Sequence, residues 1–241
     1  MKGIILAGGS ATRLRPCTKI TSKQLLPVYN KPMIYYPLNT LIKAGIKDIL
    51  IIIAPEHAGS FLNLLGSGKD FKVRFTYEIQ DEPKGLADAF IIGDKFIGND
   101  DVTMILGDNI FEDDFSNDIK SFKSGGKIFA KKVPDPHRFG VVEFNDKMQA
   151  ISIEEKPEKP KSNYAITGLY IYDNRVVEAA KKVQPSLRGE IEITELHNYY
   201  LKLNELEVAM VQGSWLDAGT FDSLLEAQIL AKEKLQDKLV I

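Results

Sequence analysis

The chain has 241 residues, 44% hydrophobic and 27% charged, and its formal net charge is -2 at pH 7. These values are ordinary for a globular protein of one large domain, and they offer no general attraction to nucleic acid or an anionic membrane. No apolar run approaches the ~20 residues of a membrane span, and the run at residues 3–7 is too short for a signal peptide. With a single cysteine, Cys17, no intrachain disulfide is possible. We therefore expect a cytoplasmic protein without nucleic-acid or membrane partners, in which Cys17 is a small packing residue.

The first half of the chain alternates short apolar runs with stretches of helical spacing. The runs rich in Ile and Val predict buried strands at residues 2–8, 48–55, 73–80 and 102–108. Apolar residues at helical spacing predict helices at about 34–42, 61–65 and 86–91, with Gly45 as a helix stop. This alternation indicates a parallel sheet with right-handed crossovers.

After Gly126 the pattern changes to strands joined by short polar turns. The predicted strands are residues 127–133, 139–145, 148–157 and 164–173. Helices at 175–182 and 193–203, a strand at 206–215 and a helix at 221–235 follow. We predict an α/β fold with a Rossmann-like, mostly parallel central sheet flanked by helices, and an antiparallel excursion attached to the same sheet. No repeat or flexible linker interrupts the chain, so residues 1–241 should form one domain.

A glycine pair followed by basic residues comes directly after the first predicted strand. Gly8 and Gly9 lie where open α/β sheets bind ligands, and their backbone N–H groups would be free to point at one. The pair alone is more typical of a plain turn, and it matches neither the P-loop nor the dinucleotide-binding pattern. Arg13 is well placed to grip phosphate oxygens. Lys23 is as consistent with a solvated lysine as with a ligand-binding one.

Carboxylates follow two other predicted strands. Asp108, in "ILGDNIF", stands on the same sheet edge as Gly8 and suits Mg²⁺, although a helix cap or Asx turn competes with that interpretation. Asp217, in "SWLDAGT", is a candidate second ligand, since Thr220 is better placed to cap the next helix. Glu155 and Lys156 end a strand, where an exposed ion pair is the alternative. The acidic residues 112–114 are more typical of a solvated turn or helix start.

The remaining reactive residues form no recognisable site. The three histidines lie far apart without metal-ligand spacing, and no nucleophile elbow is present. Phosphate-binding loops, a divalent cation and no nucleophile on the protein favour phosphoryl or nucleotidyl transfer, in which positioning and charge neutralisation dominate.

Five sequence motifs occur together in this chain. They are "LAGGSATRLRPCT…KQLLPVYNKPMI", "LGDNIF", "EEKPEKPKSNYAITGLYIYD", "RGEIEITEL" and "WLDAGTFDSLLEA". The chain resembles the glucose-1-phosphate thymidylyltransferases of the sugar-nucleotide pyrophosphorylase superfamily, from Lys2 to about Ala231. The resemblance implies a nucleotide-diphospho-sugar transferase fold, with a nucleotide-binding half (about 1–125) and a sugar-phosphate-binding half (about 126–241).

The resemblance also implies roles for individual residues. Arg13 would hold the leaving pyrophosphate, Lys23 would neutralise phosphate charge, and Asp108 and Asp217 would bind Mg²⁺; these four form the implied catalytic set. Gln80 would read the pyrimidine edge. The implied nucleotide-binding residues are Leu6, Gly8, Gly9, Ser10, Thr12, Arg13, Gln24, Gln80, Gly85 and Asp108. The implied sugar-phosphate-binding residues are Gly140, Glu155, Lys156 and Gly168, with Glu155 on hydroxyls and Lys156 on the phosphate.

The implied reaction joins dTTP and glucose 1-phosphate into dTDP-glucose with release of pyrophosphate, in a homo-oligomer (dimer or tetramer). A uridylyltransferase remains an alternative, because an apolar pocket discriminates one methyl group by only about 1–3 kcal/mol. A silent regulatory subunit should have lost Arg13, Lys23 or a carboxylate, and a glycosyltransferase should show an Asp-x-Asp motif. The family commonly has Gly where this chain has Ala11. We expect activity to survive this difference, because Ala adopts most conformations outside the left-handed region. Feedback through a C-terminal regulatory segment is in doubt, because the chain ends at Ile241.

Overall fold

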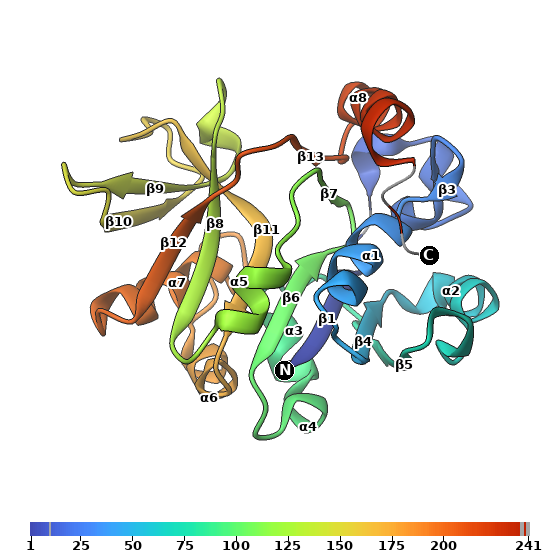
Figure 1. Cartoon of the computed structure of the whole chain (residues 1–241), viewed down its shortest axis with the longest axis horizontal. Helices are drawn as coiled ribbons and strands as arrows, with labels where there is room; N and C mark the ends of the chain where they lie inside the picture. The colour runs from blue at the N-terminus through green and yellow to red at the C-terminus, as the bar shows by residue number, and fades with distance from the viewer. Residues whose placement is uncertain (10, 237–238, 240–241) are drawn as a thin grey trace.

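The main sheet is built around β1 (Lys2–Ala7), which pairs in parallel with β4 (Asp48–Ile53) and with β6 (Val102–Leu106). Beyond β4, β5 (Arg74–Ile79) extends the parallel part. The computed structural model describes residues 1–9, 11–236 and 239, and within them nine strands form this sheet (Figure 1). The predicted α/β class and the parallel first half are confirmed.

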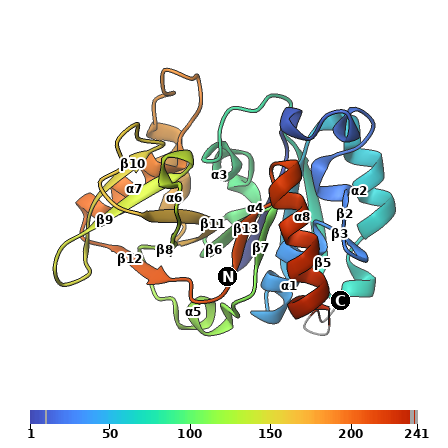
Figure 2. The same ribbon diagram turned by 90° about the horizontal axis from the view of Figure 1, so that it is seen from above.

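Helices cover both faces of the central part of this sheet, which explains why β1, β4 and β6 are almost wholly apolar. Side chains of β1 alternate: Ile4 and Leu6 pack into one hydrophobic cluster, and Ile5 and Ala7 into another on the opposite face. The second cluster contains α1 (Tyr35–Lys43), α2 (Ala58–Leu65) and α5 (Ser116–Ser121). The first contains α3 (Asp88–Ile92), α4 (Asp94–Ile97), α6 (Arg175–Lys182) and α7 (Ile193–Lys202), seen apart from α1 and α5 in Figure 2.

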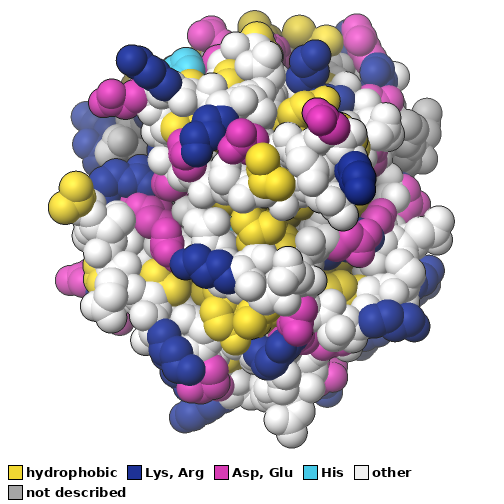
Figure 3. Space-filling model, turned by 90° about the vertical axis from the view of Figure 1, so that its left-hand side faces the viewer, with side chains coloured by type: hydrophobic (Ala, Val, Ile, Leu, Met, Phe, Trp, Pro, Cys, Tyr) yellow, Lys and Arg dark blue, Asp and Glu magenta, His cyan; other side chains and the backbone are white. Residues whose placement is uncertain are grey.

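The antiparallel part joins the parallel part through β11 (Tyr164–Tyr172), which pairs with β6. β11 also pairs with β8 (Gly126–Lys132) and β9 (Gly140–Phe144), and β9 pairs with β10 (Ala150–Glu155), all antiparallel. The antiparallel excursion is therefore confirmed. Seen from the end that carries β9 and β10, the surface intersperses positive and negative side chains around a central group of hydrophobic ones (Figure 3).

The strand predicted at 206–215 is two strands in different sheets. β12 (Leu206–Met210) runs parallel to β8, whereas β13 (Trp215–Asp217) pairs with β7 (Asn109–Phe111). Between them the backbone amides of Gln212 and Gly213 donate to the carboxylate of Asp113 at 2.7 and 2.6 Å. Asp113, expected in a solvated turn, thus holds the chain where it leaves the large sheet, and this turn brings Asp217 next to Asn109.

The C-terminal helix packs across the other end of the molecule. Thr220 caps α8 (Phe221–Leu230) through a capping box with Ser223, as the sequence predicted, and the helix continues through Ala231–Leu235 as a π-helical turn. Its buried face contacts a short hairpin of β2 (Pro27–Val28) and β3 (Lys31–Pro32). Among the helices described, none has the length and apolarity needed to cross a membrane.

Two expectations about the loop after β1 were wrong. Cys17 is exposed rather than packed. Ala11 has φ 45° and ψ 38°, which is the left-handed conformation that a glycine would adopt without penalty. The premise that Ala11 avoids this region therefore fails, and the loop holds an alanine in a conformation that costs roughly 1–2 kcal/mol.

Replacing Ala11 tests whether this backbone conformation is required. For Ala11→Gly we expect activity to persist and the free energy of unfolding to change by less than about 0.5 kcal/mol, because the relieved strain is offset by greater freedom of the unfolded chain. Ala11→Val should lose about 1–2 kcal/mol, because a β-branched residue is disfavoured at positive φ. Urea unfolding of both variants measures the difference, and equal stability of the two would contradict the left-handed assignment.

Candidate active site

A buried ion pair lies at the edge of the sheet beyond β6. Lys23, on a 3-10 turn (Lys23–Leu25), pairs through Nζ with Oδ2 of Asp108, and the two side chains are only 14% and 13% exposed. Burial opposes both charges, but Lys23 and the hydrogen bond from Asn109 hold the pKa of Asp108 below its usual value. Asp108 in turn raises the pKa of Lys23 against the effect of burial. Lys23 is thus an ordered cation and not a solvated lysine.

A second carboxylate crowds this pair. Asp217, at the end of β13, lies opposite Asn109 in register, and the N–H of Ala218 donates to the backbone oxygen of Asp108 at 3.0 Å. Burial, together with the charge of Asp108, raises the pKa of Asp217 to about 6. Asp108 and the partly exposed Asp217 thus lie close enough to repel one another, and a cation bound between them would relieve that repulsion.

The donor set of this pair fits Mg²⁺. Magnesium ions in proteins are commonly bound by one or two carboxylates, with waters and substrate phosphates completing the coordination. Within the described residues no group of three or more His, Cys, Asp or Glu side chains is arranged to hold a metal alone. A site of two carboxylates therefore suits a cation that arrives with a phosphate ligand.

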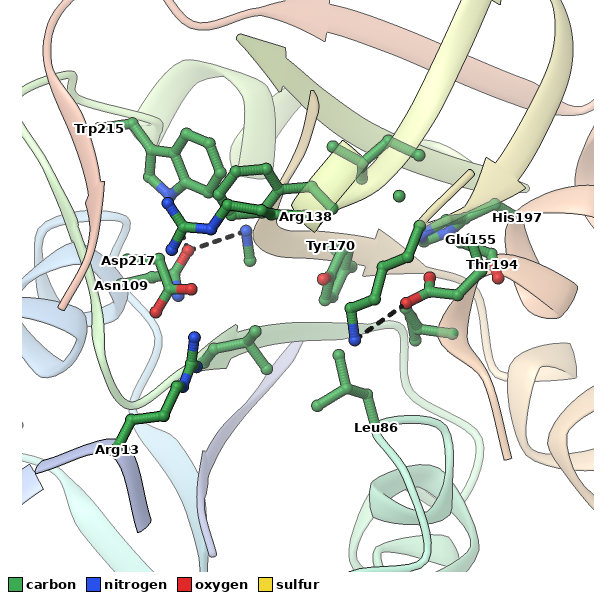
Figure 4. Close-up of a pocket in the computed structure, with 17 residues that line it drawn as sticks. Arg13, Leu86, Asn109, Arg138, Glu155, Tyr170, Thr194, His197, Trp215 and Asp217 are labelled. Carbon is green, nitrogen blue, oxygen red and sulfur yellow. Dashed lines mark hydrogen bonds and ion pairs between the residues drawn. The ribbon is translucent and has the colours of Figure 1, made fainter. Parts of the chain in front are cut away.

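Arg13 reaches the same centre from the glycine-rich loop. Its guanidinium and the carboxylate of Asp217 both lie against Gly219, where a Cβ would fall 2.8 Å from Arg13 Nη2 and 3.1 Å from Asp217 Oδ1. Figure 4 shows the two side chains pointing toward one another at one end of a cavity. Gly219 is thus required for their close approach, and Arg13 remains exposed enough to meet a ligand.

The glycine loop forms one wall of a small cavity of about 160 Å³. A Cβ at Gly8 would lie 2.8 Å from Oε1 of Gln80, and Gly9 has φ +100°. Gln80 is 7% exposed, and its Nε2 donates to Oδ2 of Asp88 at 2.8 Å, which fixes the orientation of the amide. The lining consists of Leu6, Gly8, Gly9, Gln80, Pro83, Gly85, Leu86 and Glu190.

Of the other residues expected to bind nucleotide, Gly85 lines this cavity, whereas Thr12 and Gln24 do not. Gly85 has φ +105° and lies so close to Ile191 that a Cβ would fall 2.5 Å from its carbonyl oxygen. Gln24 is buried and accepts a 2.6 Å hydrogen bond from Ser22. Thr12 lies exposed on the turn that carries Arg13, and Ser10 lies outside the described residues. A neighbouring cavity of about 470 Å³ is lined by Gly9, Ala11 and the basic residues Arg15 and Lys19, among others.

A larger cavity of about 350 Å³ opens on the other side of the carboxylates (Figure 4). Its wall contains all four residues implied to bind the sugar phosphate, which are Gly140, Glu155, Lys156 and Gly168. It also contains Arg13 and Asp217 of the implied catalytic set, so the structure brings members of the two sets to one cavity. Glu155 Oε1 lies 3.4 Å from Lys156 Nζ, an ion pair as the alternative interpretation expected, but one that faces the cavity.

Glycine is needed twice in the wall of this cavity. A Cβ at Gly168 would lie 2.5 Å from Asn109 Oδ1, and one at Gly140 would lie 3.0 Å from Thr194 Cγ2. The amide of Gly168 donates to Asn109 Oδ1 at 3.0 Å, and Trp215 Nε1 donates to the same oxygen at 2.6 Å.

Several of these residues were missed by the sequence analysis. Asn109 and Trp215 stand next to the chosen carboxylates in "GDN" and "WLD", and that adjacency was the available signal. Thr194 lies within the quoted motif "RGEIEITEL", which was the available signal for it, whereas nothing in the sequence marked Asp88 as the partner of Gln80. The missed lining residues include Pro83, Leu86, Asn109, Arg138, Phe139, Tyr170, Glu190, Thr194, His197 and Trp215, and Asp88 was missed as the partner of Gln80.

Comparison with known proteins assigns the chain to a class. Residues 2–234 match the family model for nucleotidyl transferase, so the chain belongs to the nucleotidyl transferase family. Among curated relatives, the glucose-1-phosphate thymidylyltransferase of Neisseria meningitidis serogroup A / serotype 4A is 57% identical over 233 residues, covering 94% of this chain and 81% of the relative. The enzyme of that name from Mycobacterium tuberculosis is 55% identical over 232 residues, with the same coverage.

Solved structures agree with this assignment. A crystal structure from Bacillus anthracis, described as a glucose-1-phosphate thymidylyltransferase in complex with sucrose, superposes with a TM-score of 0.92 at 48% identity over 97% of this chain and 96% of that one. A UDP-glucose pyrophosphorylase complexed with UDP-glucose shares the fold, with a TM-score of 0.85 at 24% identity over 97% and 98% of the two chains.

Proposed function

We propose that this nucleotidyltransferase joins dTTP and glucose 1-phosphate into dTDP-glucose and releases pyrophosphate. One observation carries the proposal: the cavity at Glu155 and Lys156 shares Leu86 with the cavity at the glycine loop, and its wall includes Arg13 and Asp217 of one charge centre. That centre consists of Arg13, Lys23, Asp108 and Asp217. The arrangement suits a reaction in which two anionic substrates approach from different sides.

We propose that the cavity of about 160 Å³ at the glycine loop, which is formed mainly by residues 1–125, holds the nucleotide. Gln80 offers a carbonyl oxygen and a second N–H beside its bond to Asp88, which matches the donor and acceptor edge of a pyrimidine. Leu6, Gly8, Gly9 and Gly85 shape the space for the base. Ser10, Thr12 and Gln24 belong to the same proposed set, with the triphosphate beside the basic loop.

We propose that the cavity of about 350 Å³ at Glu155 and Lys156, which is formed mainly by residues 126–241, holds the sugar phosphate. Glu155 would accept hydrogen bonds from sugar hydroxyls, and Lys156 would pair with the phosphate. Gly140 and Gly168 would leave room for the ring, since a Cβ at either position would meet a neighbouring wall residue.

In the proposed mechanism a phosphate oxygen of the sugar attacks the α-phosphorus of dTTP in line, and pyrophosphate leaves. No general base is required, because a phosphate monoester is already an anion at neutral pH. Arg13 would hold the leaving pyrophosphate and Lys23 would offset repulsion between the reactants. Mg²⁺ held by Asp108 and Asp217 would supply further neutralisation of phosphate charge.

A substrate panel tests the proposed function. Pyrophosphate release is measured with Mg²⁺ for dTTP, UTP, CTP, ATP and GTP, each paired with several hexose 1-phosphates. We expect the fastest release with dTTP and glucose 1-phosphate. Comparable rates with UTP would make the protein a broader pyrimidine enzyme, and no release from folded protein that still binds nucleotide would favour a regulatory subunit.

Replacing Gln80 tests the assignment of the base-reading residue. We expect Gln80→Ala to lower the preference for dTTP over purine nucleotides about 10²-fold, because discrimination by paired polar groups is lost. Asp88→Asn is the matched variant: it keeps Gln80 but weakens the bond that orients its amide, so its loss should be smaller. Relative kcat/KM values for dTTP and ATP measure both, and an unchanged profile in Gln80→Ala would reject this role.

Assembly and location complete the proposal. We propose a homo-oligomer, supported by the large side chains of Phe221, Leu225 and Ile229, which are 48%, 59% and 48% exposed at helical spacing on α8. Light scattering should give two or four times the chain mass of 27.0 kDa. We also propose a cytoplasmic location, for which the exposed free thiol of Cys17 is the supporting observation.

A further inference from the structure

His197 lies in the wall of the 350 Å³ cavity, at the end that carries Glu155 and Thr194 (Figure 4). It belongs to α7, one turn beyond Thr194, so both side chains are on the same side of the helix. Its side chain is fully buried. The sequence analysis considered this histidine only as a metal ligand and gave it no role.

The ring of His197 is held in one orientation by aromatic neighbours. Its centroid lies 5.2 Å from that of Tyr170 and 6.1 Å from that of Tyr172, the latter in a stacked arrangement. The hydroxyl of Tyr172 lies 2.5 Å from Nδ1. A ring fixed on both sides presents its other nitrogen in a constant direction.

The hydrogen bond to Tyr172 assigns the tautomer. Burial lowers the pKa of His197 to about 3 and raises that of the Tyr172 hydroxyl well above its usual value, so both groups are neutral at physiological pH. Among the hydrogen bonds of the described residues, Nδ1 is the partner of the Tyr172 hydroxyl, so the buried hydroxyl proton is paired only if Tyr172 donates it. Tyr172 therefore donates to Nδ1, and the ring proton is on Nε2.

Nε2 has no partner for this proton. Among the described residues it is the buried side-chain nitrogen or oxygen that lacks a hydrogen bond. Buried polar groups in proteins are nearly always paired, and an unpaired donor in a cavity wall points to a ligand or an ordered water.

We propose that His197 is a sugar-positioning residue, whose Nε2–H donates to a hydroxyl oxygen of the bound hexose directly or through one trapped water. This inference rests on the proposed function and specifies how its sugar is recognised. A neutral N–H suits a hydroxyl rather than the sugar phosphate, for which Lys156 provides positive charge. Glu155 accepts and His197 donates at the same end of the cavity, which matches hydroxyl groups that do both.

His197→Phe tests the proposal, because it keeps an aromatic ring for packing and removes the donor. We would measure kcat and KM for glucose 1-phosphate and for its 2-, 3-, 4- and 6-deoxy analogues at saturating dTTP. The KM for glucose 1-phosphate should rise about three- to tenfold, as expected for one neutral hydrogen bond. For the analogue that lacks the bonded hydroxyl, the variant and the original protein should have equal KM values. His197→Gln should recover part of the loss, because its amide still donates.

Two other results would overturn the inference. An equal rise in KM for every analogue would mean that His197 only supports packing, and an unchanged KM for glucose 1-phosphate would mean that it makes no contact. Turnover by the unmodified protein separates this failure from that of the proposed function, since no turnover with any pair rejects both.

A measurement on the unmodified protein covers the case in which His197→Phe does not fold. With ¹⁵N-labelled histidine, the Nε2–H resonance of His197 should shift on addition of glucose 1-phosphate and shift less with the responsive deoxy analogue. A resonance that does not move at saturating glucose 1-phosphate would reject the proposal.

Discussion

Asp108→Asn and Asp217→Asn should each reduce turnover by roughly 10³-fold or more, yet move the stability of the metal-free protein in opposite directions. Both variants remove a carboxylate proposed to bind Mg²⁺, and the lost charge stabilisation is worth several kcal/mol. Asn keeps the size of the side chain, so the effect on turnover arises from charge. The structural surroundings of the two carboxylates differ, and stability reports that difference.

Asp108→Asn should destabilise the protein by about 2 kcal/mol. It leaves Lys23 buried without its main partner, and breaking a buried pair typically costs ~3–5 kcal/mol. We expect a smaller loss because Asp217 still faces Lys23.

Asp217→Asn should instead stabilise the metal-free protein by about 1 kcal/mol at pH 8. The pKa of Asp217 is raised from 3.8 to about 6, so the folded state binds an extra proton between these values. Ionised Asp217 therefore lowers stability above pH 6, and this cost disappears below pH 4. The gain in the variant should follow the same dependence.

Urea unfolding at pH 4 and pH 8 in a metal chelator measures both variants, and pyrophosphate release with Mg²⁺ measures their turnover. Near-normal turnover of either variant would reject that carboxylate as a metal ligand. Equal destabilisation of both at pH 8 would reject the charge arrangement described for this centre.

Lys23→Met should have the second largest effect. Removing the cation leaves two carboxylates facing one another, so we expect the free energy of unfolding to fall by about 3–5 kcal/mol. Turnover should fall with it, because the repulsion between substrate phosphates is no longer offset. The raised pKa of Lys23 means that the original side chain is charged throughout the neutral range, whereas the pKa of Asp217 is about 6, so the loss of stability should grow as the pH rises and Asp217 ionises.

Added Mg²⁺ distinguishes charge from packing in this variant. A cation bound to the paired carboxylates should raise the melting temperature of Lys23→Met more than that of the original protein. Lys120→Met is the matched control, because Lys120 is an exposed residue of α5, and it should change neither turnover nor stability. A melting temperature of Lys23→Met that ignores Mg²⁺ would contradict the proposed metal site.

The sequence predicted best those features that depend on local pattern. Apolar runs gave β1, β4, β5 and β6 because both faces of the parallel sheet are covered, and Thr220 was recognised as a helix cap from its place before an apolar helix. Asp108 was found for the same reason, since it directly follows a strand that could be recognised.

Features that depend on distant segments could not be predicted. Lys23 is buried only because Asp108 meets it across the sheet edge, and a lysine alone gives no sign of such a partner. The break between β12 and β13 arises because Asp113, in another segment, binds the backbone of residues 212 and 213. Ala11 adopts its left-handed conformation although alanine has no preference for it.

Asn109 Oδ1 accepts hydrogen bonds from both Gly168 and Trp215, and these two bonds have a mechanical consequence. They tie β11 and β13 to the residue beside Asp108, so the proposed sugar cavity and the carboxylates share one anchoring side chain. If the proposed sugar site is right, a hexose that displaces this wall would also displace the groups proposed to act on the phosphates. Selectivity for the sugar would then depend on the alignment of the reacting groups as well as on the strength of binding.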